Sequence, residues 1–271
     1  MTTHFTTHFT TYKPFSLPKP SKQRVDRILS NRGLGNRRSL QRMIKYGDIS
    51  AIKADGEKQL IQSESETFFD DQIFELSFHQ KDQQEPIVQQ SQALPLLVAF
   101  HKPMDLLCTT DDPWGRKGID SVLPAEWRLG NLHPVGRLDA DTTGLLLFSS
   151  LGTLTQHLLH PKRQMPRTYL ATVEQIPDDL STRIAEGVAT ALGEFSGKIL
   201  KIDLVHKQVE IEVTEGKYRM VRRMLHNAGA SVTALHRIRY AQIELGDLAV
   251  GQFRILSLDE LQGLGIVFDE K

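Results

Sequence analysis

The segment His133–Phe148 constrains this chain most, because it places charged residues directly before a strand-like apolar run. The run is Leu145–Phe148, which contains no polar residue and is typical of a buried strand. The charged pair is Arg137 and Asp139, one residue apart, and Gly136 before them allows the backbone to turn sharply. The pattern therefore predicts a carboxylate held beside a guanidinium at the edge of a sheet.

A carboxylate in that position has two interpretations. In a partly buried cleft, the cation of Arg137 would offset the desolvation of Asp139 and keep it ionised, as a carboxylate nucleophile requires. Alternatively, Asp139 caps a turn and Arg137 is its partner at the surface. The spacing by itself favours the second, simpler interpretation.

The residues themselves carry a more specific signal. Gly136–Asp139 reads Gly-Arg-Leu-Asp, and Asp141–Leu147 continues as Asp-Thr-Thr-Gly-Leu-Leu-Leu. Both closely resemble the signature of pseudouridine synthases, and the longer match resembles the branch of that family that modifies ribosomal RNA. Three further stretches resemble motifs of the same family in the same order: Leu97–Pro103, Arg167–Tyr169 and Glu215–Leu225.

Some positions depart from the family pattern. Asp105 occupies a position where glycine is usual, and because aspartate tolerates left-handed backbone better than most residues, we expect it at a turn. Arg219 and Met220 occupy positions where histidine or asparagine, and then glutamine, are common. The missing glutamine puts in question one contact to RNA or to a helix end.

The resemblance implies the isomerisation of a uridine, in which the N1 glycosidic bond breaks, the uracil turns, and C5 joins the same ribose carbon. No metal, nucleotide or redox cofactor is needed for this reaction. By the same resemblance, Asp139 is the nucleophile, at either uracil C6 or ribose C1′, and Arg222 pairs with it and keeps it ionised. The alternative role for Arg222 is phosphate binding. Tyr169 would stack on the uracil and assist the loss of the C5 proton.

Other residues are assigned to substrate binding. The target base must leave the RNA stack, at a cost of about a few kcal/mol, and Arg137 would fill the space that it leaves. Leu225 would form the apolar floor of the pocket, although a leucine at helical spacing is more commonly a core residue. Arg219 and Arg223 would bind the RNA.

Residues 22–80 predict a compact unit of two short helices followed by strands. Apolar residues repeat at helical spacing over 25–29 and 40–44, and Gly47 follows the second repeat as a helix end. This order resembles the S4-type RNA-binding domain; the alternative is an unrelated basic helical module. The basic residues that would contact RNA are Arg24, Arg37, Arg38, Arg42 and Lys45.

The net charge of the chain is zero, but the charges are unevenly distributed. Residues 21–58 hold ten lysines or arginines against four acidic residues, and residues 217–239 hold six against none. The rest of the chain therefore carries a net charge of about minus twelve. Two basic stretches on an acidic remainder are typical of an RNA-binding protein, although either stretch alone also fits a solvated helix face.

We expect four segments along the chain. They are a disordered tail over 1–21, the S4-type domain over 22–80, a linker rich in glutamine and charged residues over 81–94, and a catalytic domain over 95–271. In the catalytic domain, strand-like and helix-like stretches alternate and some strands follow one another directly. This predicts an α+β fold with a mixed sheet rather than a doubly wound parallel sheet, and the resemblance implies a catalytic cleft across that sheet.

Composition narrows the cellular context. Cys108 is the only cysteine, so no internal disulfide can form and a reducing compartment is expected. No segment reaches the roughly 20 apolar residues of a membrane span, so no membrane association is expected. A bacterial cytoplasm fits, as does an organelle stroma if the threonine-rich, acid-free tail is a targeting segment. The expected partner is ribosomal RNA or an assembling ribosomal particle, bound by a monomer.

Other kinds of site fit less well. His157 and His160 lie three residues apart, like a metal-binding pair, but no third ligand accompanies them, so a surface or interface position is expected. Asp139 and Asp141 could flank a glycosidic bond, yet nothing else indicates sugar binding, and Asp141 is expected to be structural.

The function expected from the resemblance is site-specific pseudouridine formation in ribosomal RNA. Residues 110–113 and 215–218 favour small-subunit RNA as the substrate. The alternative, from another class of protein, is a ribosome-assembly factor that keeps the fold as an RNA clamp and has lost catalysis. The presence of Asp139, Tyr169 and Arg222 together argues against the clamp.

Overall fold

The computed structural model describes residues 14–17, 21–32, 37–78, 94–109, 117–124 and 132–268, the single positions 12, 19, 34 and 127, and the backbone of 87–91. The chain divides into two compact units. The larger consists of residues 1–17, 97–122 and 134–271, and the smaller of residues 18–96 and 123–133.

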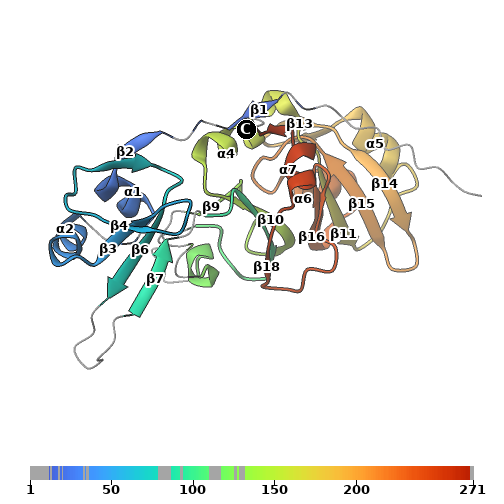
Figure 1. The fold of residues 1–271 in the computed structure, drawn as a ribbon. Helices are drawn as coiled ribbons and strands as arrows, with labels where there is room; N and C mark the ends of the chain where they lie inside the picture. The colour runs from blue at the N-terminus through green and yellow to red at the C-terminus, as the bar shows by residue number, and fades with distance from the viewer. Residues whose placement is uncertain are drawn as a thin grey trace, which may run out of the picture. The chain divides into compact units, whose positions relative to one another are not determined.

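A mixed sheet forms the centre of the larger unit (Figure 1). Its main path runs β14 (Lys198–Asp203), β15 (Gln208–Val213), β11 (Arg167–Val173), β16 (Val232–Tyr240), β10 (Thr142–Ser149), β8 (Leu97–Lys102) and β18 (Phe253–Ile255). Along this path every neighbouring pair is antiparallel except β10 and β16, which are parallel. The α+β mixed sheet expected from the sequence is confirmed.

The larger unit also contains several short strands and four helices among its described residues. β9 (His133–Pro134) leads into β10, and β17 (Ile243–Glu244) pairs with β16; β12 (Val188–Thr190) and β13 (Gly193–Phe195) form a separate hairpin. The helices are α4 (Gly152–Leu159), α5 (Leu180–Glu186), α6 (Met220–Asn227) and α7 (Leu258–Gly263), with 3₁₀ turns at Ile119–Val122 and Pro161–Arg163. Within the described residues, no helix is long and apolar enough to cross a membrane.

Gly144 makes the parallel pairing of β10 with β16 possible. Its register partner is Arg237, and a Cβ atom at position 144 would overlap the backbone carbonyl oxygen of that residue. Gly144 also has φ of +102°, which is unfavourable for a residue with a side chain. The two strands therefore approach closely only because this residue is glycine.

We expect Gly144→Ala to destabilise the protein by at least about 2 kcal/mol, since the added methyl group both strains the backbone and separates β10 from β16. Urea unfolding followed by circular dichroism measures this. The matched control is Gly152→Ala, at the start of α4, where an added Cβ meets no neighbouring atom and alanine favours the helix. Equal unfolding midpoints for the two variants would contradict the role assigned to Gly144.

The start of the chain differs from the disordered tail expected over 1–21. Phe15 and Ser16 form β1, which pairs in parallel with β19 (Ile266–Val267), and the Phe15 ring lies edge-on to the ring of His157, with 4.6 Å between centroids. A single aromatic contact and a strand of two residues produce no periodic pattern of apolar residues, so this contact could not be predicted from the sequence of residues 1–21. Residues 1–11, 13, 18 and 20 lie outside the described part of the chain.

The smaller unit has the expected order of two helices followed by strands. α1 (Val25–Asn31) and α2 (Arg37–Tyr46) are followed by a sheet of order β4 (Lys58–Leu60), β3 (Ile49–Ile52), β6 (Ile73–Phe78) and β7 (Ile87–Ser91), while β2 (Lys22–Arg24) pairs with β5 (Thr67–Phe69). Its core includes Leu29, Leu40 and Phe74, all fully buried. α2 ends at Tyr46, and Gly47 directly after it has φ of +76°.

β7 departs from the linker expected over 81–94. It pairs antiparallel with β6, from Ile87 opposite Phe78 to Ser91 opposite Phe74. The surrounding glutamines and charged residues conceal this strand in the sequence, although Ile87 and Val88 are residues that favour β structure.

Candidate active site

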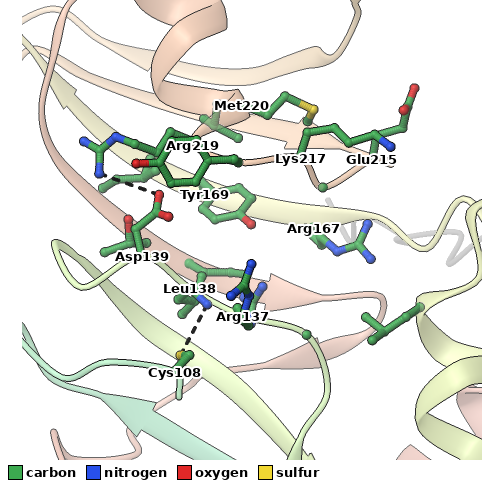
Figure 2. Close-up of a pocket in the computed structure, with 18 of the residues that line it drawn as sticks. Cys108, Arg137, Leu138, Asp139, Arg167, Tyr169, Glu215, Lys217, Arg219 and Met220 are labelled. Atoms are coloured by element: carbon green, nitrogen blue, oxygen red, sulfur yellow. Dashed lines mark hydrogen bonds and ion pairs between the residues drawn. The ribbon is translucent and has the colours of Figure 1, made fainter. Parts of the chain in front are cut away.

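A cleft of about 830 Å³ lies in the larger unit, and the residues singled out in the sequence converge on it. One side is formed by residues 135–142 and another by residues 214–221, while β11 and β16 contribute Tyr169, Leu235 and Arg237. Figure 2 shows the Asp139 carboxylate directed toward Arg219, with the ring of Tyr169 close by. A cleft of this size is sufficient for a nucleotide-sized ligand.

The loop that carries Asp139 is shaped by two residues in left-handed conformations. Gly136 has φ of +79°, and Asp105, on the neighbouring loop, has φ of +60°. The Asp105 N–H donates a hydrogen bond of 2.9 Å to the carbonyl oxygen of Ala140, which joins the two loops. The left-handed turn expected at Asp105 is therefore confirmed.

Lys102 holds the loop that carries Asp139 in place through hydrogen bonds to its backbone. Its side chain is fully buried, and Nζ donates to the backbone carbonyls of Pro103 (3.0 Å), Ala140 (3.2 Å) and Thr142 (2.9 Å). Burial lowers the pKa of Lys102 from its ordinary value, partly offset by nearby acidic groups. Lys102 belongs to the family-like stretch Leu97–Pro103, and its position at the end of an apolar strand was the only sequence signal for this role.

Asp141 is held by two arginines from the segment around α6. Arg219 makes a bidentate pair with its carboxylate, at 2.9 and 2.8 Å, and Arg222 Nη2 donates to its backbone carbonyl at 2.7 Å. The hydrogen bond from Arg219 lowers the pKa of Asp141 below its ordinary value. The pair therefore stabilises the folded state at neutral pH, and this contribution is lost as the pH falls through the folded-state pKa. The structural role expected for Asp141 agrees with this geometry.

Asp139 lies in a different environment from its neighbour. Its side chain is 27% exposed, and its closest cation is Arg219, whose Nη1 lies 3.9 Å from Oδ2. Burial raises the pKa of Asp139 above its ordinary value, and the negative charge of Asp141 adds to this, while Arg219, Arg222 and Arg137 oppose it. Asp139 is thus a partly desolvated carboxylate facing cations but not neutralised by a direct hydrogen bond from them within the described residues.

The structure differs from the expected pairing of Arg222 with Asp139. Arg222 approaches Asp141 instead, with Nη2 3.4 Å from Oδ2 of that residue as well as on its carbonyl. The reason is local backbone geometry: Arg219 precedes α6 in a left-handed conformation, with φ of +52°, and thereby reaches between the two carboxylates. Arg219, expected to bind RNA, is therefore the cation shared by Asp139 and Asp141.

The other expected site residues are placed as follows. Tyr169 is almost buried on β11 and lines the cleft, and Arg137 lines it with an exposed side chain. Leu225, expected to form the apolar floor, is fully buried on α6 and is not among the residues that line the cleft, whereas Val221, one turn earlier, does line it. Arg223 also lies outside the lining, with its guanidinium 5.5 Å from the centre of the Tyr218 ring.

Two further lining residues were not assigned a site role from the sequence. Cys108 lines the cleft, and its Sγ accepts a hydrogen bond of 3.4 Å from the N–H of Leu138; burial raises the pKa of its thiol. Arg237, on β16, lines the cleft with a side chain that is 2% exposed. Neither belongs to a recognisable local pattern: strand pairing brings Arg237 to the cleft, and Cys108 lies in the loop after β8.

The basic stretches are only partly available to a ligand. In the smaller unit, Arg38, Arg42 and Lys45 are exposed on α2, whereas Arg24 makes a bidentate pair with Asp26, at 3.0 and 2.8 Å. The side chain of Arg37 lies outside the described residues. In the second stretch, over residues 217–239, most of the basic side chains are paired or buried. Arg219, Arg222 and Arg239 make ion pairs with acidic residues, and Arg237 is buried.

Comparisons with known proteins relate this chain to one family. The family model described as RNA pseudouridylate synthase matches residues 96–245. Ribosomal large subunit pseudouridine synthase B of Haemophilus influenzae is 32% identical over 237 residues, which cover 84% of this chain and 62% of the relative. An uncharacterized RNA pseudouridine synthase of Mycobacterium bovis is 31% identical over 254 residues, which cover 92% of this chain and 95% of the relative.

The fold comparison agrees. The crystal structure of a pseudouridylate synthase superposes with a TM-score of 0.58 at 24% sequence identity, over 89% of this chain and 99% of that chain. Residues 110–113 and 215–218 favoured small-subunit RNA, whereas the relatives from Haemophilus influenzae and Yersinia pestis are both named for the large ribosomal subunit. The cleft around Asp139 falls within the residues that match the family model, and the chain belongs to the RNA pseudouridylate synthase family.

Proposed function

We propose that this protein isomerises a specific uridine of ribosomal RNA to pseudouridine, with Asp139 as the nucleophile. The observation that carries the proposal is the state of Asp139: a partly buried carboxylate, without a direct hydrogen bond from its arginine neighbours, facing a nucleotide-sized cleft. Such a carboxylate is more nucleophilic than one fully paired, like Asp141. The relatives from Haemophilus influenzae and Yersinia pestis are named for the large ribosomal subunit, so we propose large-subunit RNA as the substrate.

Recognition of the RNA is divided between the two units in this proposal. The smaller unit acts as an S4-type domain and contacts phosphates through the exposed Arg38, Arg42 and Lys45 of α2. In the larger unit, the target base leaves its stack and enters the cleft, and Arg137 fills the vacated space. Tyr169 stacks on the uracil and assists removal of the C5 proton. The bacterial relatives fit a cytoplasmic reaction on RNA or on an assembling particle.

Release of tritium from RNA labelled at uracil C5 tests the proposal, because forming the new carbon–carbon bond expels the C5 hydrogen. We expect the wild-type protein to release tritium from large-subunit RNA, free or in an assembly intermediate, and not from small-subunit RNA. Chemical mapping of pseudouridine should then identify a single position. Tight RNA binding without release from either RNA would overturn the proposal in favour of an assembly clamp.

The pKa of Asp139 predicts the acidic limit of activity. Because its folded-state pKa is raised, Asp139 becomes protonated at a higher pH than an ordinary aspartate. In a plot of single-turnover rate against pH, the acidic limb, where the rate falls as the pH decreases, should therefore lie at a correspondingly higher pH. Arg219→Gln removes the cation that opposes this shift most, so the limb should move to still higher pH. Rates of tritium release across a pH series measure both effects.

Arg223→Gln is the control for that series. Arg223 lies on α6, four residues after Arg219, and is not among the groups that shift the pKa of Asp139, so its substitution should leave the pH at which the rate falls unchanged. A limb that moves equally in both variants would show that helix α6, rather than the charge of Arg219, controls the titration.

A further inference from the structure

Arg237 is a buried cation with an unused hydrogen-bond donor at the cleft. Its Nε donates to the backbone carbonyl of Leu145 at 2.6 Å, which anchors the guanidinium against β10. Its Nη2 is also buried, and no acceptor for it is present in the described part of the chain. The residue lines the same cleft as Asp139.

Strand register explains how the guanidinium fits there. Arg237 has Gly144 as its partner on β10 and Tyr169 as its partner on β11. Cross-strand partners project on the same face of a sheet, so the arginine lies next to the ring expected to stack on the base, and on the other side no side chain obstructs it. This arrangement leaves room for the guanidinium to lean over Gly144 toward Leu145.

An unused buried donor indicates a ligand atom that completes it. Burying a charged group without full hydrogen bonding is unfavourable, and such groups in native proteins usually have a functional explanation. The hydroxyl of Thr142, also buried and lining the cleft, likewise has no partner among the described residues. Two polar groups without partners on one face of the sheet indicate a ligand that carries hydrogen-bonding atoms around the edge of its ring, as a pyrimidine does.

The chemistry of the reaction supplies a reason for a permanent cation at this position. When the N1–C1′ bond breaks, its electron pair leaves with the uracil, and the negative charge spreads over N1 and the two carbonyl oxygens. Attack at C6 instead would place negative charge on the C4 carbonyl oxygen. In either route a ring carbonyl oxygen becomes a stronger acceptor than in the bound substrate, which is where a preorganised donor accelerates a reaction.

We propose that Arg237 Nη2 donates a hydrogen bond to a carbonyl oxygen of the flipped-out uracil and stabilises the negative charge that the ring gains. The inference rests on the proposed function and adds a catalytic residue to it. Arg237 stays protonated throughout: N1–C1′ breaks, C5–C1′ forms, the C5 proton leaves to a base, and N1 takes a proton from solvent. The ring ends neutral, as it began.

A double-mutant cycle, which combines a substitution in the protein with a substitution in the RNA, tests the contact. Single-turnover rates are measured for wild-type protein and for Arg237→Lys and Arg237→Gln, each with RNA carrying uridine, 2-thiouridine or 4-thiouridine at the target. Sulfur accepts hydrogen bonds poorly, so one thio substitution should slow the wild-type protein about 10-fold more than it slows Arg237→Gln. The comparison between proteins removes the intrinsic effect of sulfur on ring reactivity.

Arg167→Gln is the matched control. Arg167 is a second nearly buried arginine of the cleft, but its Nη1 donates to the carbonyls of Met165 (3.1 Å) and Thr214 (2.9 Å). Its substitution should therefore combine additively with both thio substitutions. Additive behaviour of Arg237→Gln with both thio-RNAs would overturn the inference and leave the proposed function standing, whereas failure of the wild-type protein on uridine RNA would overturn both.

A measurement without any substitution of Arg237 covers the case in which its variants do not fold. The target uracil is labelled with carbon-13 at C2 and C4 and bound to Asp139→Asn, which holds it unreacted. A charged donor should move one carbonyl resonance downfield from its position in free RNA. Two unmoved resonances in a saturated complex would overturn the contact.

Discussion

Asp139→Asn is expected to abolish tritium release, lowering the single-turnover rate by at least about 10⁴-fold, while RNA affinity stays near that of the wild-type protein. The amide has nearly the shape of the carboxylate but cannot attack carbon. Within the described residues the Asp139 side chain makes no hydrogen bond, and its backbone carbonyl, which accepts from the Thr142 N–H at 3.1 Å, is retained in the variant, so the substitution should not disturb the fold. The rate is measured by tritium release and the affinity by filter binding.

Asp141→Asn is the matched comparison, two residues away. It removes the charge that Arg219 and Arg222 contact, so the arginines lose their partner while the nucleophile remains. We expect a much smaller loss of rate, together with reduced stability at neutral pH. If Asp141→Asn stopped release and Asp139→Asn did not, the roles of the two carboxylates would be reversed.

Lys102→Met is expected to have the largest effect on stability, about 3–5 kcal/mol, and to remove most of the activity. Methionine fills a similar volume, but the carbonyls of Pro103, Ala140 and Thr142 would lose their shared donor inside the protein. Two of these carbonyls flank Asp141, so the loop that holds Asp139 would lose its internal support. Urea unfolding and tritium release, each on the same preparation, measure the two effects.

Lys162→Met controls for the change of residue type. Lys162 is exposed in the 3₁₀ turn Pro161–Arg163, and its side chain makes no hydrogen bond to any residue that the structure describes. Its replacement should change stability by less than about 0.5 kcal/mol. A Lys102→Met protein as stable as Lys162→Met would contradict the scaffolding role.

The sequence predicted the elements around the site because their signals are local. The apolar run Leu145–Phe148, which predicted a buried strand, lies inside β10. The left-handed turn at Asp105 followed from the conformational tolerance of aspartate. The motif residues Asp139 and Tyr169 were recognised from the family resemblance and do share one cleft.

What the sequence did not predict depends on geometry between distant segments. Which arginine lies nearest Asp139 is decided by the left-handed backbone at Arg219, and nothing in the basic run 217–223 distinguishes that residue from Arg222. The position of Arg237 follows from the register of β16 against two other strands. β1 depends on a partner strand, β19, about 250 residues away along the chain.

The parallel pairing of β10 with β16 also governs how this protein folds. The Thr143 hydroxyl and His236 Nδ1 lie 2.7 Å apart across these strands, although 93 residues separate them in sequence. Closing so long a loop is entropically costly, and folds dominated by such contacts form over milliseconds to seconds. Until that closure, Asp139 is an ordinary solvated carboxylate far from Arg219 and Arg237. Activity should therefore return on refolding with the slowest structural phase, after most helical signal has recovered.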